Sequence, residues 1–166
     1  MRRIIAIEKA SAGPVEASIE LDYDLRCRRR AVYQPEGVAP ILLDRERPVH
    51  LRDGDLLRLD DGAAVAVVSA CEHLLEITAP DMAALVRIAW HLGNRHLPTQ
   101  LCEGKLLIRH DHVIADMLAG LGGVCRPVMA PFDPEGGAYA GGGHAHSGER
   151  HRDDHAHGQG HHHHPA

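Results

Sequence analysis

Short runs of β-favouring residues fill the first 70 residues of the chain and alternate between apolar and polar positions. Such alternation is typical of strands that bury one face. Asp53-Gly54 and Asp61-Gly62 lie between alternating runs and favour two tight hairpins. These signals predict a small all-β domain over residues 1–70, with strands at residues 3–9, 15–21, 25–33, 38–43, 51–59 and 63–70.

The pattern changes at about Cys71, where helical spacing of apolar residues begins. Apolar residues recur every three or four positions from Met82 to Trp90, which predicts a helix, and Asp111 is placed to cap a second one. Strands are predicted around these helices, at residues 73–78, 99–102, 106–109 and 124–130. The resulting order, βαββαβ, is that of the ferredoxin-like motif, predicted here for residues 71–134.

Periodicity ends beyond Pro131, and residues 135–166 are dominated by Gly, His and charged or polar residues. Such a segment cannot bury enough apolar surface to offset its ordering entropy. We therefore expect a disordered His-rich tail, which completes an α+β chain of two domains and a tail.

Composition excludes several classes of function. The 166 residues carry a formal net charge of −5 and only one Trp, three Tyr and one Phe, which argues against a nucleic-acid partner. No apolar run approaches the roughly 18 residues that cross a bilayer, and no signal peptide is visible. We expect a cytoplasmic chain with no membrane partner, whose scattered cysteines are free thiols: Cys27, Cys71, Cys102 and Cys125.

Histidine is the residue that points to chemistry, with 15 copies in the chain. Imidazole is a good ligand for nickel, zinc and copper, and several rings on a flexible segment can surround one ion. An expression tag would lack the interspersed Gly and Asp, so the tail is predicted to bind metal. Its histidines are His144, His146, His151, His155, His157, His161, His162, His163 and His164.

Two further places in the folded part are candidates. His110 and His112 flank Asp111, and an extended backbone there would turn both imidazoles to one face, although an exposed turn with two solvated histidines fits the spacing equally well. His96 follows the predicted end of a helix, so it is free to project outward. One exposed imidazole is a weak site, but a two-fold axis would bring two copies together.

The other histidines of the folded part, His50, His73 and His91, are interpreted as packed or surface residues. Cys71 and His73 stand two positions apart on a strand, a spacing that also permits a metal pair. No metalloprotease helix, nucleophile elbow or phosphate-binding loop occurs, so we expect no enzyme. A small metalloenzyme built on His110 and His112 would lack a nearby third ligand and base.

At this point several stretches resemble the UreE family of urease accessory proteins, which are nickel metallochaperones. They are Trp90-His91-Leu92-Gly93-Asn94-Arg95-His96-Leu97-Pro98, Ile108-Arg109-His110-Asp111-His112-Val113, Asp116-Met117-Leu118 and Pro131-Phe132-Asp133-Pro134-Glu135-Gly136-Gly137-Ala138-Tyr139. The likeness covers the whole layout, although the first third is similar mainly in its Asp-Gly turns and a basic segment at residues 26–30.

The resemblance implies a homodimer joined through the second domains, with His96 of both subunits on one Ni2+ ion. It also implies further sites at His110 and His112, a first domain that binds a peptide or partner protein, and delivery through the GTPase UreG to the apo-urease accessory complex. Zn2+ and Cu2+ would compete for the same imidazoles. The alternative is a His-rich nickel or zinc storage or detoxification protein unconnected with urease.

Overall fold

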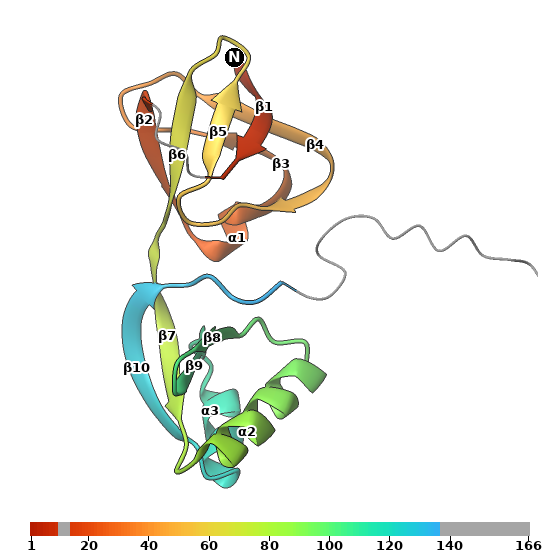
Figure 1. The fold of residues 1–166 in the computed structure, drawn as a ribbon, viewed down its shortest axis with the longest axis vertical. Coiled ribbons are helices and arrows are strands. Elements are labelled where there is room, and N and C mark those ends of the chain that lie inside the picture. Colours follow the sequence, from red (N-terminus) through yellow and green to blue (C-terminus); the bar gives the residue numbers. More distant parts are fainter. Residues whose placement is uncertain (10–13, 137–166) are drawn as a thin grey trace, which may run out of the picture.

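The computed structural model describes residues 1–9 and 14–136. It shows two separate sheets that lie one beyond the other along the long axis (Figure 1). The first sheet has six strands in the order β2-β6-β5-β1-β4-β3. Their bounds are β1 Arg2–Glu8, β2 Ala17–Leu21, β3 Cys27–Tyr33, β4 Ile41–His50, β5 Leu56–Leu59 and β6 Ala64–Ser69. Pairing is mixed, since β1 runs parallel to β4 and β2 runs parallel to β6.

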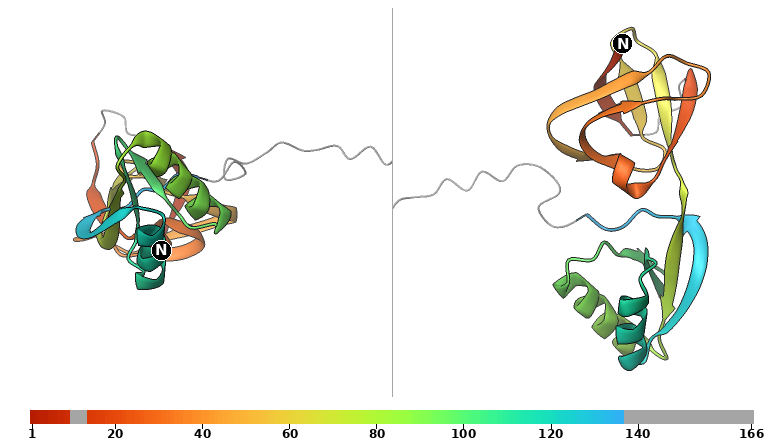
Figure 2. Two further views of the ribbon diagram at one scale, coloured as in Figure 1. Left: turned by 90° about the horizontal axis from the view of Figure 1, so that it is seen from below. Right: turned by 180° about the vertical axis from the view of Figure 1, so that it is seen from behind.

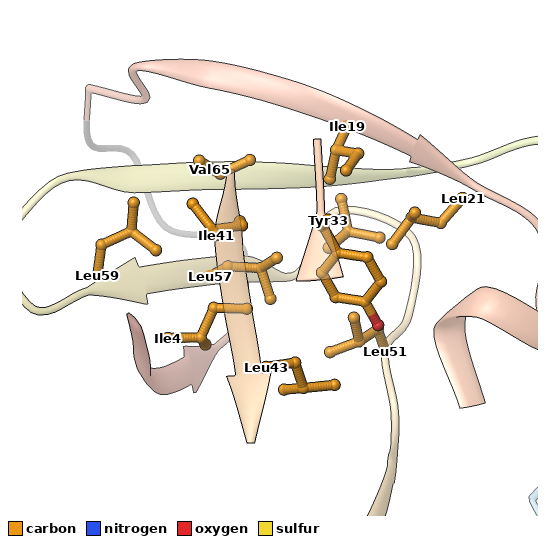
Figure 3. Close-up of a cluster of buried hydrophobic side chains, with 11 residues drawn as sticks. Ile4, Ile19, Leu21, Tyr33, Ile41, Leu43, Leu51, Leu57, Leu59 and Val65 are labelled. Atoms are coloured by element: carbon orange, nitrogen blue, oxygen red, sulfur yellow. The ribbon is translucent and has the colours of Figure 1, made fainter. Parts of the chain in front are cut away.

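The inward-facing aliphatic side chains of these strands form one closed core (Figure 3). Ile41, Leu43, Leu57 and Leu59 are fully buried, at alternate positions of β4 and β5, as the period of two predicts. Tyr33 closes one end of this core, and its hydroxyl donates a hydrogen bond to the carbonyl of Leu25 at 2.7 Å.

Four predictions for this region are wrong in part. The domain is not all-β, because Asp22 accepts a hydrogen bond from the Leu25 amide and caps a single helical turn, α1 (Tyr23–Arg26). Asp53-Gly54 forms a turn but no hairpin, since the strands on either side of it pair with other strands. The strand predicted at residues 38–43 runs instead from Ile41 to His50, and that at residues 51–59 is confined to β5.

The second sheet is antiparallel, with the order β10-β7-β9-β8. Its elements follow the predicted β-α-β-β-α-β succession, and both helices lie on one side of the sheet (Figure 2). They are β7 Cys71–Thr78, α2 Met82–Asn94, β8 Gln100–Cys102, β9 Lys105–Arg109, α3 His112–Gly120 and β10 Val124–Pro131. Asp111 caps α3 as predicted, accepting hydrogen bonds from the amides of Val113 and Ile114.

A buried arginine joins the two sheets. The Arg26 side chain is fully buried and donates hydrogen bonds to the carbonyls of Leu51 and Phe132 and to the Asp133 carboxylate. Arg52 donates to the same carboxylate at 2.8 Å. The chain that leaves β10 is thereby fixed against the first domain before the predicted tail, whose residues 137–166 lie outside the described part of the structure.

Candidate metal centre

The end of α2 positions His96. The His96 amide donates to the Gly93 carbonyl and the Leu97 amide to the Leu92 carbonyl, at 2.9 and 3.2 Å. These two bonds define a Schellman motif, in which the residue just past the cap adopts a left-handed conformation. His96 is that residue, with φ of 55°, and it is the one non-glycine residue of the described chain with positive φ.

This conformation is usually taken by glycine, because a Cβ atom there meets the backbone. His96 therefore carries local strain, and its side chain is exposed. Strain of this kind is often retained where a side chain has a function. His96 also lines a hollow of about 520 Å3, together with Tyr23 of the first domain and the Glu135-Gly136 segment that leads into the tail.

The outer face of α2 carries a row of exposed apolar side chains. Met82, Val86 and Trp90 follow one another at intervals of four residues and are 62%, 59% and 64% exposed. The opposite face of the helix buries Leu85, Ile88 and Leu92 against the sheet. The sequence pattern predicted the helix but did not show that one of its two apolar faces is exposed in the chain. Apolar residues on both sides of a helix ordinarily indicate burial on both sides.

His110 follows β9 and His112 opens α3, with Asp111 between them. The backbone of Asp111 is extended, with φ of −150° and ψ of 119°, which is the condition set for the two imidazoles to share a face. Both histidines are exposed. His110 lines a second hollow, of about 230 Å3, which shares Leu97 and Pro98 with the hollow at His96.

The remaining histidines differ in their surroundings. His50 is mostly buried, with its Nε2 3.6 Å from an Asp133 carboxylate oxygen, and burial lowers its pKa. His91 packs edge-on against Trp90. His73 is exposed and lies beside His110, since the His110 amide donates to its carbonyl at 3.0 Å. That proximity depends on strand pairing and had no signal in the local sequence.

No three His, Cys, Asp or Glu side chains converge as a metal site within the part of the chain that the structure describes. The nine predicted tail ligands, His144 to His164, lie outside those residues. Across residues 1–9 and 14–136, no helix combines the length and apolar character that crossing a membrane requires.

Two family models together match almost the whole chain. Residues 2–70 match the family model of the N-terminal domain of the UreE urease accessory protein, and residues 72–164 match that of its C-terminal domain. The chain belongs to the UreE family of urease accessory proteins. UreE is an accessory protein family, and the two matched domains meet close to the point where β6 ends and β7 begins.

Individual UreE proteins are similar over most of the chain. The urease accessory protein UreE of Beijerinckia indica is 51% identical over 133 residues, which cover 80% of this chain and 77% of that protein. UreE of Rhodopseudomonas palustris strain HaA2 is 54% identical over 138 residues, or 83% of this chain. The match spans only 63% of that longer protein.

Proposed function

We propose that this chain is a nickel metallochaperone, which captures Ni2+ and donates it for assembly of the urease active site in the cytoplasm. Membership of the UreE family supports a role in urease maturation. The structural observation that carries the proposal is His96, an exposed imidazole in a strained conformation beside an uncovered apolar helix face. A cargo-binding site needs exposed ligands of this kind, because the ion must be accepted and released.

The working form in this proposal is a homodimer. Met82, Val86 and Trp90 would pack against the same row of a second copy about a two-fold axis. His96 lies two residues beyond the end of α2, so an axis that runs along the helix would also bring the two His96 rings together. Two imidazoles from two chains would then hold one Ni2+ ion, and zinc or copper would bind the same ligands.

The tail and the partners complete the proposal. The nine tail histidines, His144, His146, His151, His155, His157, His161, His162, His163 and His164, serve as a reservoir that loads His96, and His110 and His112 provide secondary binding. Transfer proceeds through the GTPase UreG to the apo-urease accessory complex. We also propose the ferredoxin-like class for residues 71–134, supported by the sheet order β10-β7-β9-β8, with domain limits at residues 70 and 134.

Urease activation in cells tests this function. A strain that makes urease but lacks its own UreE would be complemented with the wild-type chain, His96→Ala or a matched His91→Ala control under limiting nickel. Wild type and His91→Ala should restore urease activity, and His96→Ala should not. Full activation by His96→Ala, or none by the wild type, would overturn the proposal and favour nickel storage by the tail.

A further inference from the structure

The pairing of β7 with β9 places two histidines from distant parts of the sequence side by side. Leu75 pairs with Ile108 and Leu74 with Arg109, so the next pair in this register is His73 with His110. The hydrogen bond from the His110 amide to the His73 carbonyl, 3.0 Å long, continues the ladder to that pair. Figure 1 shows β7 and β9 side by side in the second sheet.

Both imidazoles lie on the same face of the sheet. Side chains alternate along a strand, so His73 shares the face of Leu75, and His110 shares the face of Ile108. Leu75 and Ile108 are buried under the helices in one apolar cluster. His73 and His110 are both exposed, so they stand at the uncovered end of this face.

The spacing suits a shared metal ion. Side chains directly opposite in an antiparallel pair have Cβ atoms about 5 Å apart. Imidazole nitrogens bind divalent ions at about 2 Å, so two rings inclined toward each other can hold one ion between them, with water as the remaining ligands. A site with two protein ligands is compatible with the absence, among the described residues, of any three converging His, Cys, Asp or Glu side chains.

We propose that His73 and His110 form a cross-strand site for a divalent metal, present once in each chain and separate from the dimer site at His96. His73 would be its new ligand. Asp111 does not compete for the ion through its capping oxygen, because that oxygen already accepts hydrogen bonds from two amides of α3. Of the two ligands, His110 also lines the second hollow, which shares Leu97 and Pro98 with the hollow at His96.

Calorimetric titration with Ni2+ tests the site. The protein is the full-length chain with the nine tail histidines changed to Asn and with His96→Ala, which removes the competing ligands. We expect one Ni2+ per chain. His73→Ala and His110→Ala should each weaken the Ni2+ affinity about 100-fold, because a second ligand on the same scaffold acts at a high effective concentration. The double variant should bind Ni2+ more weakly than either single variant, because each single variant keeps one imidazole and the double variant keeps neither.

His91→Ala is the matched control, because His91 lies on α2, packs against Trp90 and belongs to neither β7 nor β9. Its affinity should stay within about two-fold of the parent. In the parent protein, paramagnetic Ni2+ should broaden the ring proton resonances of His73 and His110 together. Unchanged affinity in His73→Ala, a loss in His91→Ala equal to that in His110→Ala, or no binding in the parent would each overturn the proposal. None of these results bears on His96, which is absent throughout.

Discussion

The two domains of this chain bury their apolar residues to different extents. In the first domain, eleven residues of the sheet and its loops form one core, and the exposed apolar side chains, such as Ile5, Val32 and Val68, are scattered over several strands. In the second domain, α2 buries one face and leaves an equally apolar row uncovered. The exposed apolar residues of the first domain are therefore dispersed, whereas those of α2 form one row that is suited to association.

Charging the α2 row should therefore have the largest effect. We expect Trp90→Glu to convert the proposed homodimer into monomers, because a carboxylate cannot be buried unpaired in an apolar interface. The mass in solution, measured by light scattering, would halve. Val32→Glu is the matched control, since Val32 is 59% exposed on the first domain, and it should leave the mass unchanged. A wild-type protein that is monomeric in solution would show that the exposed row on α2 does not mediate association.

The junction between the domains offers a sharper test with two equal substitutions. Arg26 and Arg52 both donate to Asp133, but the Arg26 side chain is fully buried, whereas that of Arg52 is 31% exposed. Arg26→Met should lower the free energy of unfolding by about 2–3 kcal/mol, because it leaves buried carbonyls unpaired. Arg52→Met should cost about 1 kcal/mol or less. Chemical denaturation measures both, and equal losses would show that burial of Arg26 contributes nothing.

The strain at His96 predicts an opposition between stability and metal binding in the second domain. His96→Gly should raise the free energy of unfolding by about 1 kcal/mol relative to His96→Ala, because only glycine is unstrained at a φ of 55°. Both variants should lose tight nickel binding. Thermal unfolding of the metal-free proteins gives the comparison, and a less stable Gly variant would show that the left-handed turn is absent.

The smallest expected effect is a change in the pH dependence of stability, caused by His50 in the first domain. Burial, with Arg52 nearby, lowers the pKa of His50 below its ordinary 6.5, so the unfolded chain takes up this proton at a higher pH than the folded chain. His50 therefore contributes no loss of stability above about pH 6.5, and an increasing loss as pH falls below it. Denaturation of the metal-free protein between pH 7.5 and 5.5 should show a shallower decline in His50→Asn than in wild type.

His112→Asn serves as the control for that pH series, because His112 is exposed and lies at the start of α3 in the second domain. It should keep the wild-type decline. If His50→Asn and His112→Asn behave alike, the buried position of His50 has no effect on stability.

Local signals in the sequence were enough for most of the second domain. The cap at Asp111, the helix from Met82 and the βαββαβ order depend on neighbouring residues and were predicted correctly. The first domain was predicted less well, because Asp53-Gly54 has the composition of a hairpin turn while its flanking strands pair elsewhere. Register between distant strands decides those partners, and local sequence carries no record of it.

The candidate site shows the same division. The position of His96 beyond the helix end followed from Gly93 and the end of the apolar pattern. The pairing of His73 with His110, the hydrogen bond from Arg26 to Asp133 across 107 residues, and the exposure of Val86 and Trp90 all depend on tertiary structure. Sequence alone therefore interpreted His73 as a packed or surface residue, with Cys71 as its one alternative partner in a metal pair.

The nickel content of the proposed dimer tests the shared site most directly. It is measured by native mass spectrometry under limiting Ni2+, on the chain with its nine tail histidines changed to Asn. We expect dimers that carry one tightly bound Ni2+ per two chains, whereas His96→Ala should lose that shared ion and bind Ni2+ only more weakly, at the His73–His110 site of each chain. Retention of that ion by His96→Ala, or a first ion bound by isolated monomers, would contradict a site shared between two His96 side chains.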